Sequence, residues 1–600
     1  EKRNFPVDIG IEMNEVSLSA IKSCFFFNIL PNSYEPKFFD SSSLQNIRNL
    51  EYKSFMQYME DTRVKKDELV VVFNKKVKSD SYAFFAIYSK ERIGAGQFAL
   101  AVLINLVCGI LLFIPSYRKG LDISLFSKDK VKVICNDSKA FLICDLEVFD
   151  CDKHCNLTLK KGELGLYEEA YARLTCSSKK RVSLIPAPKP KSLEYIRKKF
   201  DSGREIKEEE FKLIIEEILE NKYSDVTKTF FVLACASHGL NDNEVISLTK
   251  AMINVGQVLD FKQKNSDIIV DKHCIGGIPN NRTTMIVIPI IAAAGLKIPK
   301  TSSRSITSPA GTADTMEVLA NVEVPLTQMH SIVNEVNGCL VWGGGVSLSP
   351  ADDIIIEVEH PLEIDSEGQM IASILSKKKC AGSTHVLIDI PIGKTAKISS
   401  HKKALELKRR FEKVGKAIGL EILAIITNGD EPIGNGIGPT QEALDVLSVL
   451  ENKENAPQDL LEKSLQMAGI IFEMAKVTPK EKGYEFAKEI LESGKALDKF
   501  NQIRDAQGRK ELSAKTKFVE PILATKSGKI VSMHNKYISR TAFILGAPKI
   551  QKAGLRLHKK IGDTVKKGDV LMELYSESKL KVKYAKTYIE EHQEVVEIEK

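Results

Sequence analysis

Between residues 191 and 258 the apolar positions repeat with the period of amphipathic helices. One predicted stripe consists of Phe211, Ile214, Ile215, Ile218 and Leu219. Asn241 and Glu244 have the spacing of a capping box, in which two side chains satisfy backbone N–H groups at the start of a helix. The pattern therefore predicts a small all-helical domain.

After residue 258, short apolar runs alternate with longer amphipathic segments. The runs predicted to be strands are 268–273, 339–345, 385–393 and 421–429. Segments long enough to form helices separate them. Apolar strands alternating with helices are typical of a parallel sheet that helices cover, so we expect an α/β domain here.

Two regions of short strand-like runs flank these segments. In the first, between 121 and 185, the runs VKVIC, FLICDLEVF and KRVSLI are broken by glycines and charged turns. The prolines at 186–190 favour a stiff connector to the helices that follow. From Thr516 the chain returns to short runs and glycine turns, which predicts a β-rich C-terminal domain.

A chain of 600 residues is long enough for about three to five domains. We predict a multidomain protein with α/β, all-α and β parts, in which the helical domain precedes the helix-covered α/β domain. The predicted parts are an unassigned segment 1–115, an N-terminal β domain 116–186, the helical domain 191–258 with a contribution from about 350–380, the α/β domain 259–510 and the C-terminal domain 511–600.

Composition narrows the choice of partners. Lys and Arg number 86 against 79 Asp and Glu, which gives a net charge of only +7 for this long chain. Such a balance indicates neither a nucleic-acid coat protein nor an acidic tail, and we predict no nucleic-acid partner. It does allow a local pocket for a small anion.

The eleven cysteines are scattered singly, which is typical of reduced thiols in a cytoplasmic protein. One region holds Cys135, Cys144, Cys151, His154, Cys155 and Cys176. Zinc sites usually combine two close pairs of ligands, and no second close pair follows Cys151 and Cys155. We therefore predict thiols rather than a metal site.

One apolar stretch, FALAVLINLVCGILLFIP at 98–115, raises the question of a membrane span. Its length lies near the lower limit of about 17 residues for a spanning helix. A buried helix, or two core strands meeting near Gly109, is the favoured interpretation.

The densest chemical signal is DKHCIGG at 271–277, which ends a predicted strand and precedes a helix that opens near Thr283. Ends of strands are where α/β sheets expose ligand sites. Gly276 and Gly277 allow backbone N–H groups to converge on an anion, the following helix start adds a partial positive charge, and Lys272 adds a full one. A purely structural tight turn is the alternative.

A second polar segment, TSSRSITSPAGTAD at 301–314, is rich in hydroxyls and contains one arginine. Such groups suit hydrogen bonds to phosphate-like oxygens, although a polar loop that caps the helix predicted near Thr312 would have a similar composition. Neither segment contains a P-loop pattern, which disfavours ATP hydrolysis of that kind.

Together with LSPADDIII, DSEGQMIASILSKK and ITNGDEPIGNGIGP, these motifs resemble the thymidine phosphorylase/AMP phosphorylase family, in the same order over roughly 161–576. The SSRSITSPAGTADTMEVL form is similar to the branch with archaeal AMP phosphorylases and bacterial relatives of the thymidine enzyme. The resemblance implies helical and α/β domains hinged near 258–266 and around 345–351, a hammerhead-like C-terminal domain and a homodimer. It also implies a glycosyltransferase that needs no cofactor: inorganic phosphate attacks the anomeric carbon of a nucleoside or nucleotide and releases the base.

The resemblance also assigns residues. It implies phosphate contacts for Lys272, Cys274, Gly276, Gly277, Thr283, Ser302 and Thr312. It implies substrate or base contacts for Ser303, Arg304, Ser308, Ser373, Lys377 and Lys397, of which Ser373 and Lys377 would share one helix face. His273 and Asp365 are both candidates to protonate the departing base, and the choice stays open because either could instead be structural, as a turn residue or an N-cap.

Two departures from the family pattern bear on specificity. Cys274 replaces a serine of the plain thymidine enzymes, and a thiol is a poorer hydrogen-bond donor. Glu357 stands where the family commonly has a cation, with His360 as the nearest basic residue. We favour phosphorolysis of a pyrimidine nucleoside such as thymidine; the alternative is an AMP or nucleoside 5′-monophosphate phosphorylase that yields ribose 1,5-bisphosphate.

Two further hypotheses come from other classes. A phosphoribosyltransferase would have a similar α/β architecture but would need Mg²⁺, for which Asp352 and Asp353 are candidate ligands. A membrane-tethered binding protein built around residues 1–115 is the third.

Overall fold

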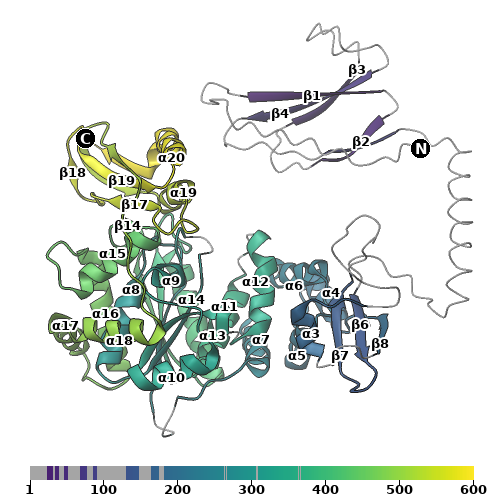
Figure 1. Ribbon diagram of the computed structural model, residues 1–600, viewed down its shortest axis with the longest axis horizontal. Coiled ribbons are helices and arrows are strands. Elements are labelled where there is room, and N and C mark those ends of the chain that lie inside the picture. Colours follow the sequence, from purple (N-terminus) through teal and green to yellow (C-terminus); the bar gives the residue numbers. More distant parts are fainter. Residues whose placement is uncertain are drawn as a thin grey trace, which may run out of the picture. The chain divides into compact units, whose positions relative to one another are not determined.

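The computed structural model (Figure 1) places the chain in two compact units, 1–124 and 125–600. The structure describes 23–31, 34–39, 46–51, 68–76, 86–90, 130–146, 164–174 and 181–599, except 262–263, 265–266, 306–307, 347, 363 and 365. Among these described residues, no helix has the length and apolar character that crossing a membrane requires. The stretch 98–115 lies outside them.

The first unit contains strands in a segment that the sequence left unassigned. They are β1 (Ser23–Pro31), β2 (Tyr34–Phe39), β3 (Asn46–Glu51), β4 (Glu68–Lys76) and β5 (Ala86–Lys90). Strands β1 and β3 pair antiparallel with β4, and β2 pairs antiparallel with β5. Runs such as ELVVVFNKK have the β-branched content of strands.

The second unit begins with the β domain predicted from VKVIC, FLICDLEVF and KRVSLI. Strands β6 (Lys130–Cys135), β7 (Phe141–Asp145) and β8 (Val182–Pro186) form one antiparallel sheet in the order β7-β6-β8, with helix α3 (Glu168–Leu174) against β7. The expectation of reduced thiols is wrong for Cys135, which is disulfide-bonded.

Five other described cysteines are free thiols: Cys144, Cys235, Cys274, Cys339 and Cys380. Cys151, His154, Cys155 and Cys176 lie outside the described residues. Within the described part of the chain, no group of three or more His, Cys, Asp or Glu side chains is arranged to hold a metal ion.

The predicted helical domain is confirmed. Its helices are α4 (Leu193–Ser202), α5 (Glu208–Leu219), α6 (Asp225–Ser237) and α7 (Asp242–Val255). The capping box of Asn241 and Glu244 opens α7, and four of the five predicted stripe residues are buried in α5. Helices α12 (Pro350–Leu362) and α13 (Glu367–Cys380) pack on this bundle, α12 in teal beside the blue helices in Figure 1.

The described part of the α/β domain contains five parallel strands. Strands β9 (Val270–Cys274), β12 (His385–Ile392) and β13 (Glu421–Asn428) are ordered β13-β12-β9, and β10 (Ile298–Ser302) pairs with β11 (Gly338–Trp342). A parallel bridge from Ile269 to Lys297 joins the two sets, so β9 and β10 end at the same edge. The four predicted strands are confirmed; β10 was missed because it is short and contains Pro299.

Helices cover both faces of this sheet. On β12, Leu387 points into one apolar core, while Val386, Ile388 and Ile390 point into the core shared with the helical bundle. The run 343–345, predicted as the end of a strand, instead begins a short helix. The helices of this domain are α8 (Thr283–Ala293), α9 (Thr312–Glu317), α10 (Leu326–Val336), α11 (Gly343–Val346), α14 (His401–Ala417), α15 (Pro439–Leu450), α16 (Gln458–Met474), α17 (Gly483–Glu492) and α18 (Lys495–Gln507).

The C-terminal region is rich in strands, as predicted, but it also carries two helices, α19 (Asn535–Leu545) and α20 (Lys579–Glu591). One sheet has the order β14-β17-β19-β15 and the other β18-β16-β20. The strands are β14 (Gly436–Ile437), β15 (Phe518–Leu523), β16 (Gly528–Met533), β17 (Gly554–Leu557), β18 (Thr564–Val565), β19 (Val570–Ser576) and β20 (Val596–Glu599). Because β14 precedes α15, the α/β segment contributes a strand to this sheet and ties the two regions together.

Candidate active site at the ends of β9 and β10

Lys272 lies near the end of β9 and is completely buried. Its Nζ donates hydrogen bonds to the hydroxyls of Thr283 at 2.7 Å and Thr284 at 3.4 Å, both in the first turn of α8. Burial lowers the pKa of Lys272, and the nearby Asp389 carboxylate partly opposes that shift. A buried ammonium bonded to neutral hydroxyls is poorly compensated, and this favours binding of an anion.

The predicted glycine turn follows directly. Gly276 and Gly277 both have a φ of +91°, in the left-handed region that favours glycine. A Cβ on Gly277 would lie 2.7 Å from the backbone nitrogen of Lys397, whereas one on Gly276 would meet nothing within 4 Å. The turn therefore packs Lys397 against Gly277 and stays open beside Gly276.

Ser302 and Thr312 approach the same edge from two other elements. Ser302 ends β10, and its hydroxyl oxygen is buried without a hydrogen-bond partner. Such a group costs about 1–3 kcal/mol unless a ligand satisfies it. Thr312 begins α9, and its hydroxyl accepts a 2.9 Å hydrogen bond from Arg282, whose guanidinium also pairs with the buried Glu442. Arg282 thereby holds the starts of α8 and α9 together.

Ser373 and Lys377 share one face of α13, as predicted. Both bind the same carboxylate oxygen of Asp352, Ser373 Oγ at 2.9 Å and Lys377 Nζ at 2.5 Å, and Lys377 also lies 3.8 Å from Asp353. Burial opposes a charge on Lys377, but the two carboxylates outweigh it and raise the pKa of Lys377. The acids considered as Mg²⁺ ligands are thus engaged by a lysine.

His273 is the next residue after Lys272 and interacts electrostatically with both Lys272 and Lys377. Burial, followed by the charges of Lys300, Lys378, Lys272 and Lys377, lowers the pKa of His273 well below its ordinary value. The imidazole is therefore neutral at physiological pH and is a hydrogen-bond donor or acceptor rather than a strong acid. The other candidate proton donor, Asp365, lies outside the described residues.

Cys274 keeps its proton. Burial, with the Asp389 charge, raises the pKa of Cys274 to about 11. Its sulfur accepts a 3.1 Å hydrogen bond from the amide of Asn281, so the thiol side chain is already engaged within the protein.

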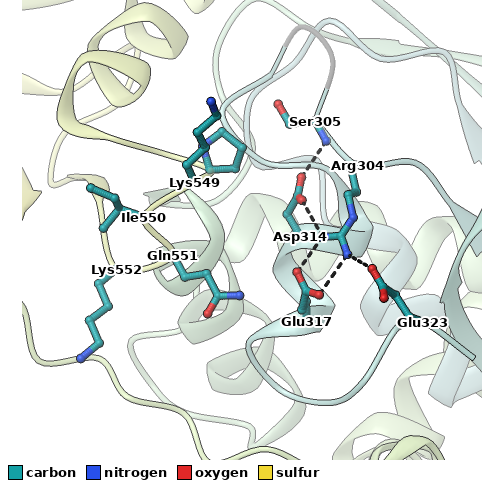
Figure 2. Close-up of a pocket in the computed structure, with 10 residues that line it drawn as sticks. Arg304, Ser305, Asp314, Glu317, Glu323, Lys549, Ile550, Gln551 and Lys552 are labelled. Atoms are coloured by element: carbon teal, nitrogen blue, oxygen red, sulfur yellow. Dashed lines mark hydrogen bonds and ion pairs between the residues drawn. The ribbon is translucent and has the colours of Figure 1, made fainter. Parts of the chain in front are cut away.

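Three of the predicted substrate residues belong to the segment after β10, where two of them have protein partners of their own. Figure 2 shows the guanidinium of Arg304 directed at Asp314, Glu317 and Glu323, at 3.5, 2.6 and 2.9 Å. Together with 548–552 these residues line a cavity of about 750 Å³. Ser303 is exposed on the loop, and the Ser308 hydroxyl donates to the carbonyl of Ala310 at 2.7 Å.

The chain matches three family models in order. They are "Glycosyl transferase family, helical bundle domain" over 193–256, "Glycosyl transferase family, a/b domain" over 266–405 and "Pyrimidine nucleoside phosphorylase C-terminal domain" over 529–596. A "Putative thymidine phosphorylase" of Legionella pneumophila (strain Corby) is 45% identical over 439 residues, 73% of this chain and 84% of that protein.

The chain belongs to the thymidine phosphorylase family. A second relative, "Putative thymidine phosphorylase 1" of Acidovorax sp. (strain JS42), is 44% identical over 440 residues, 73% of this chain and 85% of that protein. The crystal structure of anthranilate phosphoribosyltransferase from Thermus thermophilus covers 52% of this chain and 98% of its own, with 18% identity and a TM-score of 0.44. By its family models and relatives, the protein is a glycosyltransferase of the phosphorylase type.

The phosphorylase also buries charged residues near β9 that are not among the predicted site residues. Asp271 pairs with Lys378 at 2.7 Å and lies 3.6 Å from Lys300, whose Nζ donates to the Lys272 carbonyl at 2.8 Å. Burial, followed by the charge of Lys378, lowers the pKa of Lys300 well below its ordinary value. Lysines therefore outnumber carboxylates around β9, which again favours an anion.

A second missed group surrounds Asp389 of β12, which is completely buried. It binds Asn281, Thr427 and Lys463. One signal was available, because an aspartate interrupts the apolar run HVLIDIPIG. Lys463 carried none, since a single lysine in an amphipathic helix is ordinary.

Proposed function

We propose that the protein catalyses phosphorolysis of the N-glycosidic bond of a pyrimidine (deoxy)nucleoside such as thymidine, giving the free base and (deoxy)ribose 1-phosphate. The observation that carries this proposal is the buried Lys272 ammonium, bonded to the hydroxyls of Thr283 and Thr284 at the edge where the Ser302 hydroxyl is left unsatisfied. An inorganic phosphate supplies both the negative charge and the hydrogen-bonding oxygens that these groups lack.

Phosphate is already a nucleophile, so the protein needs only to position it and to stabilise the charge that develops as the bond breaks. Lys272 and the starts of α8 and α9 would hold the phosphate, and Gly276 would let it approach the backbone closely. Ser373 and Lys377 would contact the base. His273, neutral at physiological pH, would donate a hydrogen bond to the departing base. No step needs a cofactor.

The charges near Ser373 and Lys377 support a nucleoside over a nucleotide. Lys377 is paired with Asp352 and Asp353, and Glu357 adds an exposed negative charge on α12. This face therefore disfavours a dianionic 5′-phosphate. A 5′-monophosphate phosphorylase, a homodimer and a cytoplasmic location stay predictions from the sequence.

The test incubates the protein with thymidine, uridine, AMP or CMP, each with and without inorganic phosphate. Chromatography measures the free base that is released. We expect phosphate-dependent release from thymidine or uridine that EDTA does not inhibit. Release from AMP or CMP alone would identify the nucleotide enzyme, and EDTA-sensitive transfer would favour a phosphoribosyltransferase. Release from none of the four would refute phosphorolysis.

A further inference from the structure

Asp389 anchors a buried network that reaches Lys272 from the neighbouring strand. It lies opposite Cys274 in the β9–β12 pairing. One carboxylate oxygen accepts a 2.6 Å hydrogen bond from the Thr427 hydroxyl. The other accepts from the side-chain amide of Asn281 at 3.1 Å and pairs with Lys463 at 3.2 Å.

The network continues from Asn281 to Lys272. The side-chain oxygen Oδ1 of Asn281 accepts a 2.9 Å hydrogen bond from the Thr283 hydroxyl, and that hydroxyl accepts a 2.7 Å hydrogen bond from Lys272. An ammonium can only donate and an ionised carboxylate can only accept, so the two ends set the direction of every bond between them. The Thr283 proton must point to Asn281, and its lone pair must point to Lys272.

The charges around Lys272 oppose one another. The groups with the largest effects on its charge are Asp389 from β12, Cys274 from its own strand, Lys463 from α16 and Arg282 before α8. Lys300 from β10 and His273 from β9 also interact with the Lys272 charge. Asp389 favours the protonated ammonium, whereas Lys463 disfavours it, both by direct repulsion and by partly neutralising Asp389. Removing the Asp389 charge must therefore lower the pKa of Lys272, and removing the Lys463 charge must raise it.

We propose that Asp389 and Asn281 are positioning residues that orient the Thr283 hydroxyl and hold the Lys272 ammonium at the phosphate site, with Lys463 as the opposing charge. The proposal rests on the proposed function, because it takes phosphate to be the ligand of Lys272. Neither residue needs to touch substrate: each acts through Thr283 and Lys272.

The test measures phosphate affinity by calorimetry, and kcat and KM for phosphate with thymidine, on the full-length chain between pH 6 and 10. In Asp389→Asn we expect KM for phosphate to rise roughly 10²-fold. Phosphate affinity should decrease at alkaline pH as Lys272 loses its proton, and we call this decrease the alkaline limb. The alkaline limb should move to lower pH in Asp389→Asn and to higher pH in Lys463→Met. Asn281→Ala, which keeps the Asp389–Lys463 pair, should raise KM for phosphate by roughly 10-fold and leave KM for thymidine nearly unchanged.

Glu244→Gln is the matched control. It also converts a buried carboxylate, paired with Lys199 at 2.8 Å, into an amide, but it lies in the helical bundle. We expect it to lower the melting temperature without moving the alkaline limb. If Asp389→Asn does not fold, the opposite shift in Lys463→Met and the selective KM effect in Asn281→Ala still decide the question.

The positioning role would be overturned if the alkaline decrease in phosphate affinity moved in the same direction in Asp389→Asn and Lys463→Met, or did not move, and Asn281→Ala kept wild-type phosphate affinity. Phosphorolysis itself would remain intact in that case. A wild-type chain that neither binds phosphate in the calorimeter nor releases base would instead overturn the proposed function, and the positioning role with it.

Discussion

Lys272 and Arg304 stand in the two polar segments that suggest an anion site, yet the fold treats them differently. Lys272 is fully buried and donates to the hydroxyls of Thr283 and Thr284. The Arg304 side chain is 31% exposed and pairs with three carboxylates, from Asp314, Glu317 and Glu323. A cation in a promising motif is available to a ligand only when its neighbours leave its charge uncompensated.

Burial enlarges this difference. A buried ammonium that makes no direct ion pair gains strongly from an arriving anion. A partly exposed guanidinium already paired with carboxylates gains little, and those carboxylates would repel the anion. The hydrogen bonds with Glu317, followed by the charges around them, raise the pKa of Arg304, while burial lowers that of Lys272.

Lys272→Met should have the largest effect. We expect kcat/KM for phosphate to fall by at least about 10³-fold, because the substitution removes the full charge aimed at the anion. The melting temperature should stay the same or rise, since a poorly compensated buried ammonium is replaced by an apolar chain of similar length. Steady-state kinetics and calorimetry measure both, and an equal loss of folding and activity would contradict the assignment.

The second-largest effect should be the decrease in phosphate affinity at alkaline pH. Because the pKa of Lys272 lies below that of an unfolded lysine, about 10.4, phosphate affinity should fall by up to about tenfold per pH unit once the ammonium deprotonates. Between the pKa of Lys272 in the folded protein and that in the unfolded chain, the unfolded chain binds more protons at this residue. The contribution of Lys272 to the free energy of unfolding therefore rises with pH in this range. The stability of wild type relative to Lys272→Met should therefore increase as phosphate affinity decreases. A parallel decline of both would contradict the shift.

Ser302→Ala should have an intermediate effect. We expect KM for phosphate to rise by roughly tenfold, because the buried hydroxyl that lacks a protein partner is the one left for phosphate. Chemical denaturation should show unchanged stability or a gain of about 1 kcal/mol, since no protein hydrogen bond is lost. A clear loss of stability with normal phosphate affinity would show that the hydroxyl serves the fold.

Arg304→Ala should have the smallest effect on phosphate use. We expect KM for phosphate to change by less than about threefold and stability to fall by roughly 1 kcal/mol, because two of the three carboxylates that the arginine joins are partly exposed. A loss of phosphate affinity as large as that in Lys272→Met would remove the contrast between the two cations. It would place Arg304 at the ligand after all.

Much of the local structure was predictable because it depends on residues that are close together in the sequence. The stripe in α5 and the capping box of Asn241 and Glu244 are each set by side chains within a few positions of one another. The glycine turn at 276–277 follows for the same reason, because its backbone angles favour residues without a Cβ. Strand β10 was not predicted because it contains Pro299, and a proline within a short run disfavours the prediction of a strand.

The site itself was predictable only in part. The motifs around Lys272 and on α13 pointed to residues that the fold does bring to neighbouring positions, with His273 sensing the charge of both Lys272 and Lys377. The same motifs carried no information on how Arg304 would be paired, because Glu323 reaches it from outside the predicted loop.

The sequence by itself determined the order of the domains, the strands that end in polar residues and the family to which the chain belongs. Only the tertiary structure decided which charges are compensated. Asp389 and Lys463 lie more than a hundred residues from Lys272 along the chain, yet both face it in the folded protein. Electrostatic energy depends on distance in space and on burial, and neither can be read from neighbouring positions in a sequence.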